Sequence, residues 1–422
     1  MMTTEPKVSL LELVTSLSNA ADLISPAVVN HHKQVAYIAL RLGTELGLPK
    51  ENISDLVIAG SLHDIGALSL RERIEALNFE IEDPYDHAEK GFHLLSVFKP
   101  FSKIAEYVRF HHTIWNCGDG AWVDNHKVPL ESHILHLADR VAVSIDSRQE
   151  VLGQVTDVCS LIENQNGRMF NPNVVDALRS LSHKECFWLD CVSDSIGTIL
   201  SNLIEFKSVQ LNLDGILALA NIFSVIVDFR CRFTANHSSG VAACAEKLAG
   251  LAGFSKHDSK IMKVAGYLHD LGKLAVPVEI LNKPSSLTTA EFQIIKSHTY
   301  YTYRILEPIT GFEIINSWAS FHHEYLNRSG YPFHHGEAEL SLGSRIMGVA
   351  DVFTALSEDR PYRAGMDKEN AMKIIRQMVN DKAFDADVVA LLKDNYEDVN
   401  LCRLAAQDIL RKEYKLLRPE GI

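Results

Sequence analysis

The sequence lacks the features that would place the chain in a membrane, outside the cell or on a nucleic-acid polymer. No stretch approaches the roughly eighteen uninterrupted apolar residues of a membrane-spanning helix. The N-terminus has an early acid and no basic cluster, so it does not indicate a secretory signal. The seven cysteines form no CxxC pair and are odd in number, which predicts reduced thiols and a cytoplasmic protein. A net charge of -13 argues against binding DNA or RNA polymers, which require a basic face.

The length and the periodicity of the chain indicate several helical domains. At 422 residues the chain is too long for one ordinary core. Hydrophobic residues make up 46% and charged residues 23%, as in globular proteins. Segments such as 36–47, 240–253 and 371–379 carry helical periodicity, whereas strand-like alternation is scarce. The sequence therefore predicts a mostly α fold.

An internal duplication organises the chain. The segment NHHKQVA at 30–36 resembles NHSSGVA at 236–242, and each precedes a helix ending in His-Asp-hydrophobic-Gly. Seven polar positions recur in the same order in both halves, with an offset that grows slightly through two small insertions. Because chance does not keep seven polar positions in register, we predict one domain at 1–205 and a second at 206–422.

The repeated polar residues of the second half have the composition of a metal site. Neutral imidazole and carboxylate together suit Fe, Mn or Zn, with Fe or Mn preferred here, and seven ligands are about right for two ions. Asp270 is the natural bridge, because it lies beside His269 at a helix end and adjacent helical residues point about 100° apart. The candidate ligands are His237, His269, Asp270, His298, His322, His323 and Asp351.

Two divalent ions would suit the hydrolysis of a phosphodiester. A water bridging two ions about 3.5–4 Å apart becomes hydroxide at neutral pH, and the ions neutralise charge on the phosphoryl oxygens. Lys273, one turn after Asp270, can reach a phosphate oxygen in the transition state. We therefore expect Asp270, Lys273 and His269 to act in catalysis.

The motifs HDLGK, HHEYLNRSGYP and ADVFTALSEDRPYR closely resemble those of the HD-GYP family of the HD phosphohydrolase superfamily. The resemblance covers essentially all of 230–400, and these motifs are highly specific in combination. It implies an all-α bundle holding two or three metals, and hence two tandem HD-type helical bundle domains in this chain. It also implies cleavage of a bacterial cyclic dinucleotide second messenger, cyclic di-GMP or 3',3'-cyclic GMP-AMP, to the linear 5'-phosphorylated dinucleotide.

The resemblance further assigns roles to individual residues. By that resemblance the seven residues above are the metal ligands, with Asp270 bridging, and Lys273 contacts the scissile phosphate. Gly330, Tyr331 and Pro332 form the signature loop, with Tyr331 near the substrate. Arg360 and Arg363 match positions that bind substrate phosphate or base, for which the planar guanidinium is suited.

Two positions depart from the family pattern. Members with a third metal carry a Glu one helical turn before the first ligand His, and here that position is Phe233. A two-metal centre is therefore the expectation. Arg328 stands in the signature loop where Gly is usual, and two interpretations stay open: an altered access to the site, or a solvated loop residue.

The first half keeps the ligand-type residues but loses those that handle substrate. Ala67 stands in the place of Lys273, Thr113 in that of Glu324, and Gly118-Asp119-Gly120 in that of the signature loop. Arg148 keeps the place of Arg360, whereas Val151 replaces Arg363. The retained residues, a possible second metal site, are His31, His63, Asp64, His87, His111, His112 and Asp139. We expect a degenerate structural or regulatory domain; an enzyme of altered specificity and an empty relic are the alternatives.

Three functions remain distinguishable at this stage. The main hypothesis is a metal-dependent phosphodiesterase acting on a cyclic dinucleotide in the second half. A phosphohydrolase of mononucleotides or (p)ppGpp is the alternative within the superfamily. A non-catalytic receptor for cyclic dinucleotides is the alternative of another class. The sequence leaves open the choice between the two cyclic dinucleotides, and whether the chain forms a homodimer or binds a signalling partner.

Overall fold

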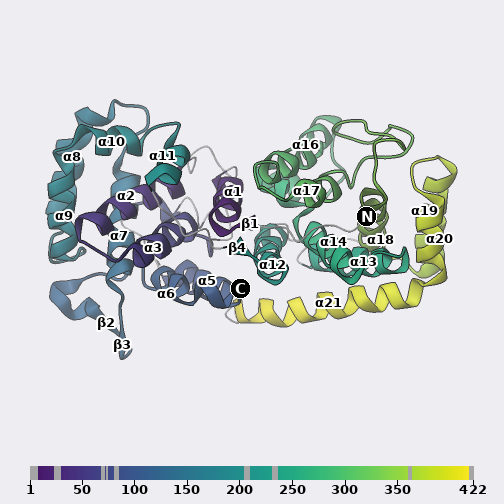
Figure 1. The fold of residues 1–422 in the computed structure, drawn as a ribbon, viewed down its shortest axis with the longest axis horizontal. Coiled ribbons are helices and arrows are strands. Elements are labelled where there is room, and N and C mark those ends of the chain that lie inside the picture. The colour runs from purple at the N-terminus through teal and green to yellow at the C-terminus, as the bar shows by residue number, and fades with distance from the viewer. Residues whose placement is uncertain are drawn as a thin grey trace. The chain divides into compact units, whose positions relative to one another are not determined.

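The fold is almost entirely helical. The computed structural model describes residues 8–22, 30–67, 72, 75–79, 85–203, 210–230, 236–359 and 364–417. Within these ranges strands are limited to two short antiparallel pairs (Figure 1). The predicted mostly α fold is thus confirmed. Across the same ranges, no helix combines the length and the apolar character needed to traverse a bilayer.

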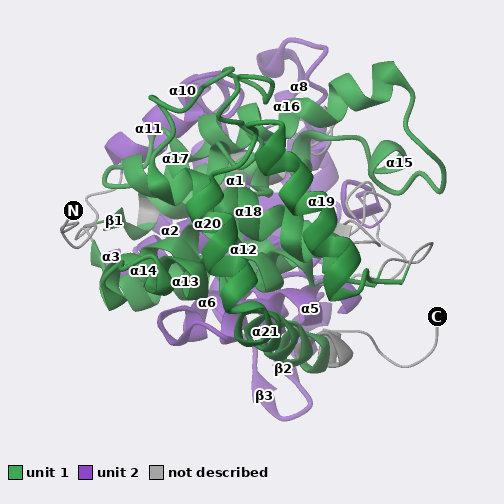
Figure 2. Cartoon of the chain, turned by 90° about the vertical axis from the view of Figure 1, so that its right-hand side faces the viewer, with its two compact units in different colours: residues 1–20, 210–422 green, residues 21–209 purple. Residues whose placement is uncertain are grey.

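The chain divides into two compact units. The N-terminal unit comprises residues 21–209, and the C-terminal unit comprises residues 1–20 and 210–422 (Figure 2). The division at 209 lies close to the predicted boundary at 205, but residues 1–20 group with the second half, contrary to the predicted range 1–205. Backbone pairing connects them, because β1 (Val8–Ser9) lies antiparallel to β4 (Gln210–Leu211).

The N-terminal unit is a helical bundle with one small hairpin. Its described elements are α2 (His31–Glu45), α3 (Lys50–Leu62), α5 (Tyr85–Ser96), η2 (Lys99–Phe101), α6 (Ser102–Arg109), η3 (Asn116–Ala121), β2 (Trp122–Val123), β3 (His126–Lys127), α7 (Leu130–Ser144), α8 (Val151–Glu163), α9 (Pro172–Ser182), α10 (Glu185–Cys191) and α11 (Ile196–Leu203). Helix α2 is central and packs on α3, α7 and α9.

In the C-terminal unit α13 is the central helix and packs on α14, α18 and α21. Besides β1, β4 and α1 (Leu10–Asp22, of which residues 10–20 belong here), its described elements are α12 (Leu213–Arg230), α13 (His237–Leu251), α14 (Lys256–Leu268), η4 (Leu271–Ala275), α15 (Val278–Leu281), α16 (Thr289–Leu306), α17 (Glu313–Ser320), α18 (Leu342–Ser357), α19 (Lys368–Asn380), α20 (Ala386–Asp394) and α21 (Tyr396–Leu417).

In each unit the helix that begins with the first candidate ligand packs closely against the next helix: α13 against α14, and α2 against α3. A Cβ on Gly266 of α14 would lie 2.5 Å from the Cα of Ala242 on α13. The matching pair in the N-terminal unit is Gly60 and Ala36, with 2.8 Å between the corresponding atoms. Only glycine permits this approach, since real Cβ contacts are longer. The two ligand-bearing helices therefore cross at small residues.

A second glycine joins the His-Asp turn to the next ligand helix. A Cβ on Gly272 would lie 1.9 Å from the carbonyl oxygen of His298 on α16, and one on Gly66 would lie 2.0 Å from that of His87 on α5. In each unit the glycine therefore sets the distance between the aspartate and the following histidine.

The start of α16 follows the local pattern of its sequence. The Thr288 side chain accepts a hydrogen bond from the Glu291 backbone N–H, and the Glu291 carboxylate accepts one from the Thr288 backbone N–H, which completes a capping box. These bonds satisfy backbone donors at the helix start. The capping box fixes the first turn of the helix that carries His298.

Candidate metal centre

The C-terminal unit brings its seven predicted ligands together. They come from the start of α13, the residues directly after α14, helix α16, the turn after α17, and α18: His237, His269, Asp270, His298, His322, His323 and Asp351. Six of them are buried, and the side chain of His323 is 23% exposed. The cluster is therefore enclosed by protein and open at His323.

Asp270 lies between two groups of imidazoles. Its Oδ2 is 3.2 Å from Nε2 of His269, and its Oδ1 is 3.4 Å from Nε2 of His298. His237, His269 and Asp270 offer ligand atoms within 4.8 Å of one another, and so do His298, His322 and His323. The two carboxylate oxygens thus face the two groups, which is the geometry of a bridging carboxylate.

The backbone orients three of these rings. Nδ1 of His269, His298 and His322 each lies close to the carbonyl oxygen three residues earlier, at 2.7, 2.7 and 2.6 Å. A carbonyl only accepts, so Nδ1 carries the proton and donates it. The other nitrogen, Nε2, is then unprotonated, and its lone pair is directed into the cluster, where it can bind a metal ion.

The unprotonated nitrogens fit a metal ion. Nε2 of His298 and Nε2 of His322 are only 3.3 Å apart, and two lone pairs at this distance repel each other unless a cation lies nearby. Nε2 of His269 is fully buried and has no hydrogen-bond partner among the described residues. Buried polar atoms are rarely left unpaired. The donor set therefore fits divalent ions that accept imidazole nitrogen and carboxylate oxygen.

The protonation states of the cluster also suit a metal. Burial lowers the pKa of His298 to about 3, and it lowers the pKa values of His322 and His323 as well. Burial alone would raise the pKa of Asp270, but His269 and Lys273 beside it hold that pKa well below its usual range. Neutral imidazole and ionised carboxylate are the forms that bind metals.

Glu358 is a residue of the site that the sequence patterns did not identify. Its Oε1 lies 3.1 Å from Nδ1 of His237, while Oδ1 of Asp351 lies 3.0 Å from Nε2 of the same ring. Burial lowers the pKa of His237, but Glu358 and Asp351 outweigh this effect and raise it well above its usual range. A proton and a metal ion therefore compete for Nε2. The only sequence signal is an acid seven residues after Asp351.

Lys273 lies where an ammonium can act on a bound phosphate. Its Nζ forms an ion pair with Oδ2 of Asp270, and its side chain is 19% exposed. It follows Asp270 in η4, so the short helix holds the cation beside the carboxylate. The structure thus places Lys273 at the edge of the cluster.

The signature loop folds back over His323. The backbone N–H of Tyr331 donates to the carbonyl of His323 at 3.1 Å, and the two rings lie 5.0 Å apart. Gly330 approaches so closely that a Cβ would lie 2.4 Å from that carbonyl oxygen. Pro332 follows directly and is partly exposed. Burial, followed by Tyr325, Asp351 and Asp270, raises the pKa of Tyr331, so its phenol stays protonated.

Other predicted positions lie outside this arrangement. Arg360, Arg363 and Phe233 fall outside the described residues. Arg328 has a φ of 65°, which explains why glycine suits this position. Its side chain is 60% exposed and pairs with Glu339 at 2.7 Å. The structure thus favours the solvated interpretation of Arg328.

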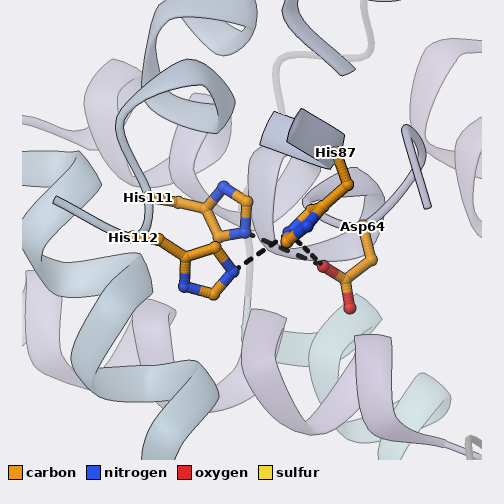
Figure 3. A group of neighbouring side chains, drawn as sticks. All are labelled: Asp64, His87, His111 and His112. Carbon is orange, nitrogen blue, oxygen red and sulfur yellow. Dashed lines mark hydrogen bonds and ion pairs between the residues drawn. The ribbon is translucent and has the colours of Figure 1, made fainter. Parts of the chain in front are cut away.

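The N-terminal unit holds a second cluster of the same design. Oδ2 of Asp64 lies 3.2 Å from Nε2 of His63, and Oδ1 lies 3.4 Å from Nε2 of His87 and 3.7 Å from Nε2 of His111. In Figure 3 the rings of His87, His111 and His112 lie on one side of Asp64, and dashed lines join its carboxylate to His87 and His111. Nε2 of His87 and Nε2 of His112 are 3.0 Å apart. Asp64 therefore has the bridging position that Asp270 has in the other unit.

Unpaired atoms show that this second cluster also fits metal ions. All seven of its residues are buried. The atoms that have no hydrogen-bond partner within the described part of the chain include His31 Nε2, His63 Nε2, His111 Nε2, Asp64 Oδ1 and Asp139 Oδ1. They belong to one cluster, and a shared cation would satisfy them together.

The N-terminal cluster differs from the other in its charged neighbours. Arg140 is buried and binds Oδ2 of Asp139 at 2.5 Å, whereas Val352 follows Asp351 in the C-terminal unit. Asp119, in the middle of the tripeptide that replaces the signature loop, is exposed. One carboxylate oxygen of Asp139 is thus occupied by Arg140. The tripeptide Gly118-Asp119-Gly120 contains no aromatic residue that could take the place of Tyr331.

Two further replacements remove cations from the N-terminal site. Ala67 is buried in the place of Lys273 and carries no charge. Arg148, which keeps the place of Arg360, has an 87% exposed side chain paired with Asp146 at 2.9 Å. The unit therefore keeps the metal-type ligands without these substrate-handling groups.

Comparison with protein families finds HD domains in both halves. The matched residues are 28–144 and 221–388, each to a family described as HD domain. Each match spans the candidate ligands of its own unit.

Comparison with known proteins finds relatives along nearly the whole chain. The chain is 30% identical to the 3'3'-cGAMP-specific phosphodiesterase 1 of Vibrio cholerae, covering 93% of each chain. It is 37% identical to a cyclic di-GMP phosphodiesterase of Pseudomonas aeruginosa, over 35% of each chain. A crystal structure of a cyclic GMP-AMP specific phosphodiesterase of V. cholerae matches with a TM-score of 0.62 and 24% identity, covering 93% of this chain and 98% of that one.

These likenesses agree with the geometry of the cluster. The solved structure supports the fold, and the full-length relative, together with the two HD domains and the GYP loop over His323, supports the family. The chain belongs to the HD-GYP family of cyclic dinucleotide phosphodiesterases, within the HD phosphohydrolase superfamily, and carries a second HD domain in its N-terminal half.

Proposed function

We propose that the C-terminal unit hydrolyses one phosphodiester bond of 3',3'-cyclic GMP-AMP or cyclic di-GMP and releases the linear 5'-phosphorylated dinucleotide. The observation that carries the proposal is the position of Asp270 between two groups of imidazoles, with Lys273 paired to its Oδ2. The full-length relative named for 3'3'-cGAMP favours the mixed dinucleotide as the first substrate to test. The P. aeruginosa relative, which matches 35% of the chain, keeps cyclic di-GMP as the second.

Two divalent ions, which we propose to be Fe or Mn, would be held by the seven ligands and would supply Lewis acidity and an activated water. In the overall reaction one water adds to the phosphorus, the bond from phosphorus to the ribose 3'-oxygen breaks, and that oxygen gains a proton. The phosphate group remains attached to the 5'-oxygen of the linear product. These changes balance without any further reactant.

Four side chains that are not metal ligands are proposed to bind the substrate or to stabilise its transition state. Lys273 donates to the phosphoryl oxygens as negative charge develops, in a site where protein replaces water. Tyr331, a protonated phenol beside His323, can donate a hydrogen bond to the substrate. Arg360 and Arg363 are proposed to hold a substrate phosphate or base, by the family resemblance alone. The contacts of Lys273 with Asp270 and of Tyr331 with His323 support the first two of these assignments.

The experiment that tests this function is product analysis. Purified protein is incubated with Mn(II) or Fe(II) and each cyclic dinucleotide separately, in parallel with Asp270→Ala. Linear 5'-phosphorylated product from the wild type, absent in the variant, is the expected result. Tight binding without turnover in either metal would contradict it and favour a receptor. Hydrolysis of (p)ppGpp or mononucleotides in preference to both cyclic dinucleotides would favour a different phosphohydrolase.

We propose that the N-terminal unit binds metal without hydrolysing cyclic dinucleotides and has a structural or regulatory role. Its unpaired buried nitrogens support the metal, and Ala67, Asp119 and the exposed Arg148 argue against substrate handling. The free cysteines in the described ranges agree with our proposal of a cytoplasmic protein. A homodimer or a signalling partner would be the route by which such a unit reports to the catalytic one.

A further inference from the structure

Two side chains near the metal centre, Phe292 and Lys296, have no task in the chemistry described above, and both contact the ring of Tyr331. Phe292 and Lys296 lie on α16, one turn apart, and Tyr331 lies in the signature loop. The Lys296 ammonium is 5.1 Å from the centre of the Phe292 ring and 5.4 Å from that of Tyr331. The two rings meet edge to face at 6.4 Å. A cation therefore lies between two aromatic side chains.

This group borders the metal centre. Lys296 precedes the ligand His298 by two residues, and the Tyr331 ring lies 5.0 Å from that of the ligand His323. Phe292 is 42% exposed and Lys296 is partly buried. The group thus extends from the open side of the cluster, at His323, to the surface.

Lys296 has a charge that no acid neutralises in the described part of the chain. No carboxylate there lies within 4.0 Å of its Nζ, whereas Lys273 and Lys283 each pair with one. Contact with two aromatic faces stabilises an ammonium and also removes part of its water. A partly dehydrated cation beside an active site is suited to bind an anion, and lysine is a common ligand of phosphate.

A cyclic dinucleotide brings a second phosphate and two bases to the site. The metal ligands and Lys273 serve only the phosphodiester that is cut. The other phosphodiester is fixed to it by the closed ring and must also be held. An ammonium matches its charge, and an exposed aromatic face offers a stacking surface to a base.

The N-terminal unit lacks this group. Tyr85 has the place of Lys296, two residues before the ligand His87, and Asp119 has the place of Tyr331. The cation and the ring are thus absent from the unit that also lacks Lys273 and the signature loop. Metal ligands alone do not require the group, which points to a role with substrate.

We infer that Lys296 binds the phosphodiester that is not cut, and that Phe292 stacks on one base, so that this group selects ligands carrying two phosphates. The inference rests on the proposed function, since it assumes a cyclic dinucleotide at the same centre. It adds a recognition site on α16 to the chemistry at Asp270.

Direct binding tests the inference independently of turnover. The metal-loaded full chain is titrated with the phosphorothioate analogues of both cyclic dinucleotides, which resist hydrolysis. Lys296→Gln should raise Kd by about ten-fold or more, since a hydrogen bond to a charged group contributes about 1.5–3 kcal/mol. Lys296→Arg should keep most of the affinity. Lys368→Gln is the matched control, because that ammonium lies 4.8 Å from the Tyr396 ring. An unchanged Kd in Lys296→Gln would overturn the inference.

A second measurement separates substrate binding from a disturbance of α16. For bis(p-nitrophenyl) phosphate, which carries one phosphodiester, any loss in Lys296→Gln should be about ten-fold smaller than for the cyclic dinucleotide. Equal losses of kcat/KM on the two substrates would assign Lys296 to the support of His298 and overturn the inference. Phe292→Ala should raise Kd while Phe292→Trp retains it, and no effect of Phe292→Ala would overturn the stacking. Absence of wild-type turnover would reject the proposed function, and the Kd comparison would still decide the role of Lys296.

Discussion

Glu358 lies against His237 on the side of the ring that faces away from the ligands, with 3.1 Å between Oε1 and Nδ1. Asp351 lies 3.0 Å from Nε2 of the same ring. A carboxylate on the outer nitrogen fixes the tautomer of a metal-binding histidine and makes its inner nitrogen more basic. Glu358 is therefore a positioning residue for His237.

The first prediction concerns this contact. Glu358→Gln removes the charge but keeps the size, and should lower metal affinity by about 10–100-fold, as loss of such outer partners does. Chelator competition followed by metal analysis measures the change. The matched control is Asp146→Asn, at the same spacing after Asp139, because Asp146 pairs with the exposed Arg148 instead. Equal metal loss in both variants would contradict the assigned role.

The second prediction separates Lys273 from metal binding. Lys273→Ala should lower kcat by about 10²–10³-fold, the usual cost of removing one donor that stabilises transition-state charge. Metal content should stay at the wild-type level, because Lys273 is not a ligand. Lys283→Ala is the control, since Lys283 also forms a partly buried ion pair, with Glu291. A parallel fall in metal content would mean that Lys273 acts by holding Asp270.

The third prediction tests what holds the signature loop. Oε1 of the buried Glu324 accepts a hydrogen bond from the backbone N–H of Phe333 at 2.7 Å. Glu324→Ala leaves this donor unpaired, at a cost of about 1–3 kcal/mol, and should raise KM for the cyclic dinucleotide about ten-fold. Glu324→Gln keeps an acceptor and should show a smaller effect. Identical kinetics of the two variants would exclude this bond as the cause.

The fourth prediction concerns acid stability. Burial lowers the pKa of His133 to about 4, below the value near 6.5 of an exposed histidine. The unfolded chain therefore takes up a proton below about pH 6.5, whereas the folded chain does so near pH 4. The free energy of unfolding should fall between these pH values, by about 2 kcal/mol at pH 5.

Substitution isolates this contribution. His133→Gln does not titrate, so its stability should decrease less than that of the wild type between pH 7 and pH 5. Urea unfolding at each pH measures the difference. His126→Gln, at an exposed position on β3, should follow the wild-type curve. If His133→Gln loses stability with pH as steeply as the wild type, other buried groups account for the acid sensitivity.

The duplication allowed the ligands to be predicted because it turns isolated histidines into a pattern. His269 alone is uninformative. Its match with His63, together with the agreement of the flanking positions, favours the interpretation that the repeated residues form one site in each half. The structure brings both sets together. The capping box of Thr288 and Glu291 is likewise determined locally, because its bonds connect residues three apart.

Other features depend on contacts that sequence spacing does not determine. Lys296 resembles any surface lysine until α16 and the signature loop place it between two rings. Arg140 follows Asp139 directly, yet only the fold turns its guanidinium onto that carboxylate. Residues 1–20 group with the second half, and Val8 pairs with Leu211. Strands of two residues are too short to be predicted from the sequence.

The last prediction compares the two bridging aspartates. Asp64→Asn and Asp270→Asn make the same change at matched positions, and each removes the charge shared between two groups of imidazoles. Asp64→Asn should lower the metal content of the chain and its melting temperature, because an ion that binds only the folded state stabilises it. Hydrolysis of the cyclic dinucleotide should continue. Asp270→Asn should abolish hydrolysis while the N-terminal metal remains. If Asp64→Asn keeps the full metal content, the N-terminal unit is an empty relic. If it stops hydrolysis without loss of metal from the C-terminal unit, the N-terminal centre controls the catalytic one and has a regulatory function.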